Sequence, residues 1–324
     1  GPGPWTASAS AWSGLVAERV RLGLIGCGPH VRSQHLPALR ACAAEVDLVG
    51  IADPQAEARD RLIAAWGEAV PAYASADDLL AADRCQAVLV GTPSRFTAAL
   101  SRQVAATGAT VWIEKPIAAT LADAERLVAD LGDHPAMVSL NRRFDPAFAA
   151  VLAWAATHRP RRIVAEMARE NRSEPDFLTE TAIHLVDVVL ACSGPIAIAE
   201  VVADPAGCRI RSGGAGIAVE VAILPRSGRN AERLRVEADD GWAEAASGWF
   251  DTGVWTISDQ AGTRSGGMER SLPDWQRNGT LGETRAFLAA CRGEVVLRPR
   301  PADFLPAARF CAEAARRLVG TATA

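Results

Sequence analysis

Apolar runs and helical patterns alternate through the first third of the chain. Runs typical of buried strands occur at residues 20–25, 47–52, 87–91 and 110–113, and segments with helical spacing follow them, ending near residue 41 and covering 54–66, 75–81 and 95–106. Strands that alternate with helices at this rhythm predict a parallel, doubly wound sheet. Ligands of such sheets bind beyond the carboxyl ends of the strands, so the residues that follow each strand are the first candidates for a site.

A glycine turn follows the first strand. Gly26 permits a tight turn, and Gly28 lets the backbone approach a pyrophosphate beside the N–H groups of the next helix. Pro29 suits the opening of that helix, where its missing N–H costs nothing. Val31 stands where the dinucleotide-binding pattern has its third glycine. The pattern predicts a nucleotide site that includes Gly26, Gly28, Pro29 and His30.

Asp53 ends the second strand, 25 residues after Gly28. At this place an acidic side chain accepts hydrogen bonds from an adenosine ribose, and its charge would repel a 2′-phosphate. The spacing therefore favours NAD over NADP, although Arg59, six residues later, would weaken that preference. The alternative is that Asp53 caps the helix at residues 54–66, because Asp is frequent at N-caps.

The next two strands end in short segments that carry candidate cofactor contacts. Thr92-Pro93 follows one strand, and Glu114-Lys115 follows the next. Lys115 is the only lysine in the chain, whereas the other 33 of its 34 basic residues are arginine. Arg cannot release a proton in a protein and Lys can, so a position that stays Lys in an arginine-rich chain indicates proton transfer. The alternative is the chance survival of one surface lysine.

Composition narrows the class of protein. A net charge of −4 and a pI near 5.8 argue against a nucleic-acid partner or an anionic membrane surface, and no apolar stretch approaches the ~20 residues of a membrane span. The seven cysteines are scattered and never form Cys-x-x-Cys, which predicts reduced thiols in a cytoplasmic protein and no metal site. Residues 1–19 are rich in Gly, Pro, Ala and Ser and predict a mobile leader.

Alternating apolar and polar residues dominate the second half. Segments at 162–168, 196–203, 216–224, 231–238, 242–246 and 254–258 predict strands, the later ones antiparallel. Helical spacing predicts helices at 175–191, 282–290 and 302–318. We therefore expect a nucleotide-binding domain over residues 20–140 and a second domain over residues 141–324, with the C-terminal helix returning to cover the first.

Short motifs occur in a recognisable order along the chain. They are Gly26-Cys-Gly28 with His35-Leu-Pro-Ala-Leu39, Gly91-Thr92-Pro93, Glu114-Lys115-Pro116, the segments 141–148 and 183–187, and the helix from Gly279 to Phe287. Together they resemble the family of glucose–fructose oxidoreductase and inositol 2-dehydrogenase (Gfo/Idh/MocA). The resemblance implies a Rossmann domain followed by an α/β domain on a large, mainly antiparallel sheet. It also implies a homodimer or homotetramer that assembles through that sheet.

The resemblance implies catalytic roles for Lys115 and His184. Lys115 would bind the reacting hydroxyl or carbonyl, His184 would act as general acid or base, and Glu180 would orient it from the same helical face at i, i+4 spacing. Which of Lys115 and His184 passes the proton stays open. The family has an aspartate at the position of Glu180 and a tyrosine at that of Arg142. Without the resemblance, the apolar helix around His184 favours a core residue.

Three arginines near these motifs bear on the substrate. Arg143, Arg169 and Arg172 suggest a carboxylate or phosphate, because arginine forks bind planar anions; the alternative is salt bridging at strand ends. The predicted function is NAD(H)-dependent hydride transfer at the hydroxyl-bearing carbon of a sugar, cyclitol or related small molecule. Two alternatives remain: an imine or ketone reductase of secondary metabolism, and a nucleotide-binding sensor without turnover.

Overall fold

The chain folds into two compact units. The computed structural model describes residues 19–214 and 216–322, and residues 1–18 of the predicted leader lie outside the described residues. The parallel-sheet unit contains residues 19–140 and 280–305, and the antiparallel-sheet unit contains residues 141–279 and 306–322. Residues 280–305, which the pattern places in the second domain, pack instead with the parallel sheet.

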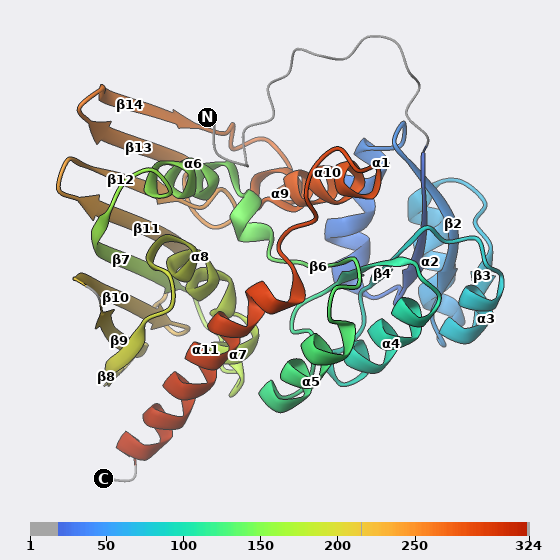
Figure 1. Ribbon diagram of the computed structural model, residues 1–324, viewed down its shortest axis with the longest axis horizontal. Coiled ribbons are helices and arrows are strands. Elements are labelled where there is room, and N and C mark those ends of the chain that lie inside the picture. Colours follow the sequence, from blue (N-terminus) through green and yellow to red (C-terminus); the bar gives the residue numbers. More distant parts are fainter. Residues whose placement is uncertain (1–18, 215, 323–324) are drawn as a thin grey trace. The chain divides into compact units, whose positions relative to one another are not determined.

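In the described part of the chain, the parallel-sheet unit has a six-stranded sheet in the order β3-β2-β1-β4-β5-β6, and every neighbouring pair is parallel (Figure 1). Its strands are β1 (Val20–Ile25), β2 (Val46–Ala52), β3 (Ala72–Tyr73), β4 (Ala87–Val90), β5 (Thr110–Ile113) and β6 (Ala136–Val138). The strand order reverses at β1, which makes its carboxyl end the switch point where such sheets bind ligands. The predicted parallel, doubly wound sheet is confirmed.

Helices connect these strands. They are η1 (Val31–His35), α1 (Leu36–Ala41), α2 (Ala56–Trp66), α3 (Ala76–Ala81), α4 (Ser94–Ala106) and α5 (Leu121–Leu131). The hydroxyl of Thr120 caps α5 by accepting the N–H of Asp123 at 3.1 Å. The sequence analysis did not predict α5 or β6, although Thr120 and Asp123 form the spacing that marks a helix start.

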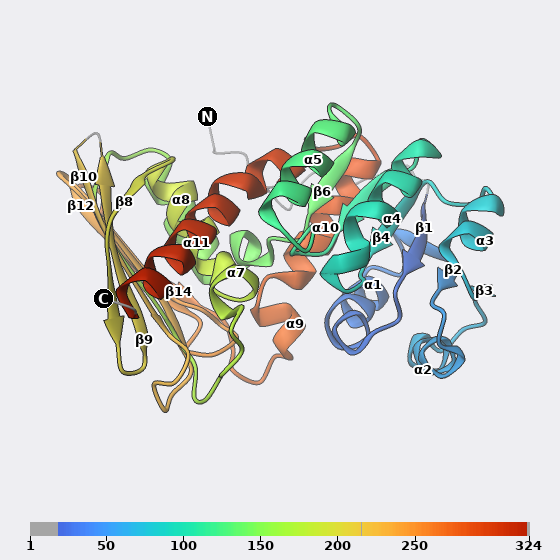
Figure 2. The same ribbon diagram turned by 90° about the horizontal axis from the view of Figure 1, so that it is seen from below.

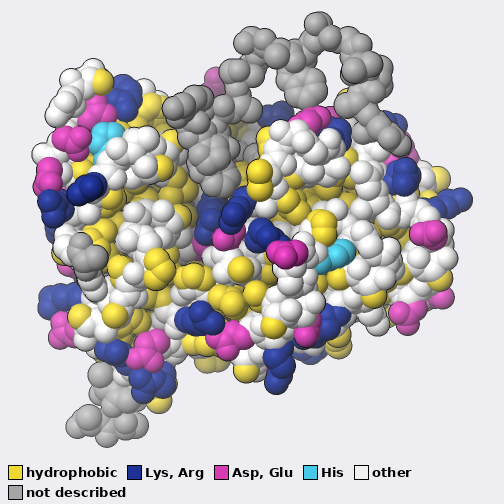
Figure 3. Space-filling model, in the orientation of Figure 1, with side chains coloured by type: hydrophobic (Ala, Val, Ile, Leu, Met, Phe, Trp, Pro, Cys, Tyr) yellow, Lys and Arg dark blue, Asp and Glu magenta, His cyan; other side chains and the backbone are white. Residues whose placement is uncertain are grey.

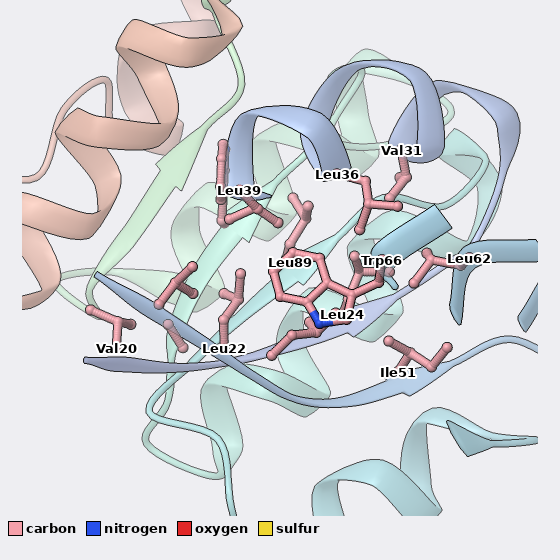
Figure 4. Close-up of a cluster of buried hydrophobic side chains, with 14 of the residues drawn as sticks. Val20, Leu22, Leu24, Val31, Leu36, Leu39, Ile51, Leu62, Trp66 and Leu89 are labelled. Carbon is pink, nitrogen blue, oxygen red and sulfur yellow. The ribbon is translucent and has the colours of Figure 1, made fainter. Parts of the chain in front are cut away.

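Leucine side chains from both sides of the first turn fill the core of this unit. Leu22 and Leu24 of β1 contribute to one buried cluster with Leu36 and Leu39 of α1 (Figure 4). Each such side chain removed from water stabilises the fold by roughly 1.5–3 kcal/mol. The apolar runs that predicted the strands therefore mark the segments that the core needs.

Helix α10 (Thr280–Cys291) joins the parallel-sheet unit through an aromatic pair. The Phe287 ring stacks on the Trp112 ring of β5 with 4.7 Å between centroids. Phe287, Leu288 and Trp112 are all fully buried in the core cluster. This packing, and not the position in the sequence, decides where residues 280–305 belong.

The antiparallel-sheet unit has, within the described residues, an eight-stranded sheet in the order β14-β13-β12-β11-β7-β10-β9-β8 (Figure 2). Its strands are β7 (Pro160–Ala168), β8 (Ala197–Asp204), β9 (Gly207–Gly214), β10 (Ile217–Leu224), β11 (Ala231–Ala238), β12 (Gly241–Ala246), β13 (Val254–Asp259) and β14 (Gly262–Gly267). Only the central β7–β10 pair is parallel. The predicted large, mainly antiparallel sheet is confirmed; β9 and β14 were not predicted, because arginine and glycine interrupt their apolar pattern.

Helices lie along one face of this sheet in both views (Figures 1 and 2). They include α6 (Pro146–Ala155), α8 (Ile183–Ser193) and the part of α11 (Pro301–Ala322) from residue 306 onward, with the short η2 (Asn141–Phe144), α7 (Phe177–Glu180) and α9 (Asp274–Arg277) nearby in the chain. On β11, Leu234 and Val236 are buried, while Arg233 and Arg235 lie on the opposite side of the strand. Alternation along each strand thus separates a helix-covered face from a charged one.

Candidate active site

The glycine turn after β1 combines a strained position with an open one. Gly26 has φ of 97°, and a Cβ there would lie 2.5 Å from the carbonyl oxygen of Gly91. A side chain is therefore excluded at Gly26 by both conformation and space. A Cβ at Gly28 would meet nothing within 4 Å. The backbone at Gly28 thus faces open space, which fits the close approach of a pyrophosphate.

Val31 replaces the third glycine without disturbing this turn. Its side chain points into the core beneath the helix (Figure 4), and a Cβ on Gly91 would collide with it. The small residue that lets helix and sheet approach is therefore on the strand side, at Gly91. The helix widens into a π-turn over η1, the kind of irregularity that is frequent at functional sites.

Asp53 is fixed by two backbone donors at the end of β2. Its Oδ2 accepts the N–H of Cys27 at 2.8 Å, and its Oδ1 accepts the N–H of Gln55 at 2.9 Å. The N-cap of α2 is Gln55, so the alternative that Asp53 caps this helix is wrong. Arg59 donates to the carbonyl oxygen of Asp53 at 2.5 Å. A carboxylate has about four acceptor sites, so Asp53 can still accept hydrogen bonds from a ribose diol.

A groove of about 690 Å³ runs past the glycine turn. Its lining includes these predicted cofactor residues: Gly26, Gly28, Pro29, Asp53, Thr92 and Pro93. It also includes Arg61, Arg95 and Phe96, which the sequence analysis did not single out. The Phe96 ring is 49% exposed and carries the Arg95 guanidinium 4.6 Å from its centre. In the sequence, Phe96 is recognisable only as an apolar residue near the start of a helix.

Glu114 and Lys115 follow β5 and are not among the residues that line this groove. Glu114 is buried and contacts two histidines: its Oε1 bonds the Nε2 of His35 and lies 3.5 Å from the Nε2 of His30. Burial raises the pKa of the Glu114 carboxyl, but His30 and His35 outweigh it, and the pKa lies well below its usual range. Lys115 is half-buried. The sequence does not predict this cluster, because His35 and Glu114 are 79 residues apart and only the folding of the sheet brings them together.

The two histidines and Glu114 also have the chemistry of metal ligands. Their ligand-type atoms lie within 4.8 Å of one another. Metal-bound histidine normally donates its other ring N–H to an acceptor, whereas the buried Nδ1 of His35 has no hydrogen-bond partner among the described residues. His35 Nε2 also forms a direct hydrogen bond with Glu114 Oε1, so these two atoms are closer together than two ligands of one metal ion would be. We therefore assign this cluster to hydrogen bonding and not to a metal.

The predicted helix at residues 175–191 is wrong as a single element. Helix α7 ends at Glu180, and α8 begins at Ile183, with Thr181 and Ala182 between them. His184 lies half-buried in the first turn of α8, where its backbone N–H donates to Thr181 O at 3.4 Å. Glu180 is half-buried at the end of the preceding turn. The break removes the i, i+4 argument for their pairing, since that spacing applies only within one helix.

The three predicted substrate arginines are all paired with carboxylates. Arg143 forms a bidentate pair with Asp187 at 2.6 and 2.7 Å, Arg169 bonds Glu232, and Arg172 bonds Glu174 at 2.6 Å. Salt bridging, the alternative, is what the structure shows. The same mixing of charges is visible on the surface, where Arg side chains lie beside Asp and Glu over the face in Figure 3. An anionic substrate group therefore has no support from these arginines.

Arg142, the departure from the family's tyrosine, belongs to a buried network. It bonds both oxygens of Glu232 at 2.5 and 2.9 Å, and Arg169 bonds the same carboxylate. Arg142 is 1% and Glu232 0% exposed. The Trp249 ring lies 4.8 Å from the Arg142 guanidinium. A buried guanidinium requires a buried carboxylate. Its partner Glu232 lies 90 residues away, and no local pattern links the two positions.

Comparison with known proteins places the first unit. Residues 20–142 match the sequence profile of the Gfo/Idh/MocA family, described as an oxidoreductase family with an NAD-binding Rossmann fold. The resemblance expected from the motifs is thereby confirmed over residues 20–142, which form an NAD-binding Rossmann fold with the switch-point geometry described above.

Two relatives of known name match part of this chain. Inositol 2-dehydrogenase of Rhizobium meliloti is 37% identical over 137 residues, which are 41% of this chain and 39% of that protein. Inositol 2-dehydrogenase 1 of Saccharopolyspora erythraea is 33% identical over 133 residues, 40% of this chain and 39% of that protein. The matched stretch thus spans about two fifths of the length of both relatives.

A solved structure extends the likeness of the fold to both units. Myo-inositol dehydrogenase of Lactobacillus casei, solved with NAD(H) and myo-inositol, gives a TM-score of 0.76 at 20% identity, covering 93% of this chain and 94% of that one. At this identity the likeness shows the fold. Among the described residues, no helix combines the length and the apolar character that a bilayer crossing needs.

Proposed function

We propose that this protein is an NAD(H)-dependent dehydrogenase that transfers hydride between nicotinamide and the hydroxyl-bearing carbon of a small polar molecule. The carrying observation is the groove at the switch point of β1, where Gly28 faces open space and the fixed carboxylate of Asp53 lies in the lining. Together they offer a pyrophosphate cradle and a ribose acceptor in one groove. NAD, when bound, supplies the hydride acceptor.

Lys115 and His184 are proposed to handle the proton. Lys115 stands directly after β5, at the strand edge where parallel sheets carry their chemistry. It would donate a hydrogen bond to the reacting oxygen, and His184 would exchange the proton as general acid or base. Glu180 would still orient His184, now across the short α7–α8 connection and not along one helix face.

NAD is the proposed cofactor in preference to NADP. Asp53 would stand against a 2′-phosphate, and Arg59 is occupied by the backbone carbonyl of Asp53. Arg61 and Arg95 line the same groove and would lessen the discrimination. We therefore expect a preference for NAD that is measurable and not absolute.

The proposed substrate is an uncharged polyol, either a cyclitol or a sugar. Two relatives that match about two fifths of this chain are named inositol 2-dehydrogenases. The arginines that would have recognised an anion are engaged by Asp187, Glu232 and Glu174. A hydroxyl-rich ring needs hydrogen bonds from neutral and half-buried groups, which is compatible with that arrangement.

Turnover of a polyol panel tests this proposal. Myo-inositol, other inositols and common sugars would be incubated with the purified chain and NAD, and NADH formation followed by absorbance. Reduction of NAD by at least one uncharged polyol, with no advantage for sugar phosphates or sugar acids, is expected. Tight NAD binding without turnover of any alcohol would contradict the proposal and indicate a nucleotide sensor.

Assembly and location are proposed on separate grounds. In the described residues the helices of the antiparallel-sheet unit lie on one face of its sheet, and the other face carries Arg233, Arg235 and the 45% exposed Val254. We propose a homodimer or homotetramer through that face, to be tested by light scattering. The seven cysteines, all within the described residues, carry free thiols, which supports a reducing, cytoplasmic location.

A further inference from the structure

The backbone leaves the parallel sheet at Lys115. The N–H of Glu114 still donates to Val90 O of β4 at 3.0 Å. The next N–H, that of Lys115, is instead accepted by Oε2 of Glu114 at 3.0 Å. A buried N–H left without an acceptor is costly. The Glu114 carboxylate therefore replaces a strand carbonyl as the hydrogen-bond acceptor for the backbone N–H of Lys115, the only lysine of the chain.

This carboxylate is itself held by two histidines from the helix after the glycine turn. His35 is 1% exposed, and its ring stands edge-on against Trp112 with 5.0 Å between centroids. Its Nδ1 has no partner in the described part of the chain, so its proton belongs on Nε2, which donates to Glu114 Oε1.

His30 is the member of the cluster that meets solvent. Its side chain is 56% exposed, while its Nε2 lies 3.5 Å from the same oxygen of Glu114. The two rings also pack edge to face, 5.6 Å apart. Glu114 thus has one oxygen facing His30 and His35 and the other facing the Lys115 N–H. All of these groups favour the ionised carboxylate.

We propose that Glu114 is a positioning residue, which fixes the backbone of Lys115 and stabilises the protonated form of its amine. An ionised carboxylate that already contacts the Lys115 N–H lies within the length of one lysine side chain of the ammonium. A nearby negative charge favours the protonated ammonium over the neutral amine. This inference rests on the proposed function, because it assigns the role of Glu114 through Lys115.

The sole lysine gives a direct readout that needs no substrate. Acylation by acetic anhydride across neutral to alkaline pH follows the neutral amine, and mass spectrometry of the tryptic peptide at residues 103–126 reports Lys115 alone. In Glu114→Gln we expect the labelling midpoint to fall by about one pH unit. Glu57→Gln, which changes an exposed glutamate of the same unit, should leave the midpoint unchanged. An unchanged midpoint in Glu114→Gln would overturn the proposal.

The variant Glu114→Asp distinguishes the effect of the carboxylate charge from the effect of the side-chain length. It keeps the ionised group but withdraws it by one methylene, so the labelling midpoint should stay near that of the native chain. The shorter side chain cannot meet both His35 and the Lys115 N–H, and kcat should fall at least tenfold, with the Kd of NADH unchanged. Full kcat in Glu114→Asp, or a midpoint as low as in Glu114→Gln, would refute the positioning role.

The outcomes also separate this inference from the proposed function. A lowered midpoint in Glu114→Gln in a chain that oxidises no polyol would sustain the coupling of Glu114 to Lys115 and reject the dehydrogenase proposal. Polyol turnover together with an unchanged labelling midpoint in Glu114→Gln would support the dehydrogenase proposal and reject the coupling of Glu114 to Lys115. Glu114→Asp keeps the test open if the Gln variant does not fold.

Discussion

The two units bury charge in different ways. In the parallel-sheet unit, Glu114 lies at the end of a strand and contacts His30, whose side chain is 56% exposed. In the antiparallel-sheet unit, Glu232 is enclosed with Arg142 and Arg169, and all three side chains are at most 4% exposed. The first cluster links a buried charge to solvent at a ligand-binding edge, whereas the second is closed. We therefore propose that the first cluster takes part in the chemistry and that the second stabilises the fold.

Glu232→Gln gives the largest expected effect on stability. The variant keeps the shape of the side chain but leaves two buried guanidiniums without their anion, which should lower the free energy of unfolding by about 3–5 kcal/mol. Urea denaturation measures it. Glu166→Gln, which breaks the exposed pair with Arg229, is the matched control and should cost about 1 kcal/mol or less. Equal losses in the two variants would remove the distinction between a closed network and surface pairs.

Asp145 adds a pH dependence to the same closed region. Burial raises the pKa of its carboxyl to about 6, against hydrogen bonding from Ser247 and the charge of Arg142. The folded chain then holds this proton to higher pH than the unfolded chain, so the group's stabilising contribution is full at low pH and is lost as pH rises through about 6.

A variant isolates this effect from the other carboxylates. Relative to Asp145→Asn, the native chain should lose about 3 kcal/mol of unfolding free energy between about pH 4 and about pH 7. Denaturation curves of both chains at matched pH values provide the comparison. If the difference between the chains does not change with pH, Asp145 titrates normally.

Lys115→Arg should lower turnover and leave stability unchanged, which is the opposite of the effect expected for Glu232→Gln. Charge and stem are kept, so stability and NADH affinity should persist, while kcat should fall at least ~10²-fold because the wide planar fork replaces a compact donor that can release its proton. Lys115→Met should lose a comparable factor, showing that charge alone is not the requirement. Near-native turnover of the Arg variant would mean that the only lysine has no chemical role.

His184→Ala tests whether the antiparallel-sheet unit also contributes a group to proton transfer. Turnover should fall about 10²-fold, the usual scale for a lost general acid or base. NADH affinity should stay close to native, because His184 lies outside the Rossmann unit. Intact turnover together with a lower unfolding free energy would show a core histidine and make that unit structural throughout.

Asp53→Ala should have the smallest effect of the series. Loss of the carboxylate removes hydrogen bonds to the ribose and the repulsion of a 2′-phosphate, so the preference for NAD over NADP should shrink by about tenfold. Titration of both nucleotides by fluorescence measures it. Tighter binding of NADP by the native chain would overturn the role of Asp53.

Periodicity predicted the regular parts of both sheets. The sequence predicted β1, β2, β4 and β5 because strands buried on both faces of a sheet consist mainly of apolar residues. The glycine turn and Asp53 were legible because a motif at fixed spacing needs only local geometry. The break between α7 and α8 was not, since nothing in the apolar spacing of residues 175–191 marks Thr181 as a helix end.

The amino-acid pattern was enough to predict the parallel sheet and the glycine turn at Gly26 and Gly28, and it singled out Lys115 as the only lysine. Tertiary structure alone decided which charges meet. Glu114 lies 79 residues from His35, and Glu232 lies 90 residues from Arg142. Ion pairs between distant segments leave no periodic trace, because each side chain taken alone is compatible with an exposed surface. Packing of sheet and helix brings them together, and burial then makes the pairing obligatory.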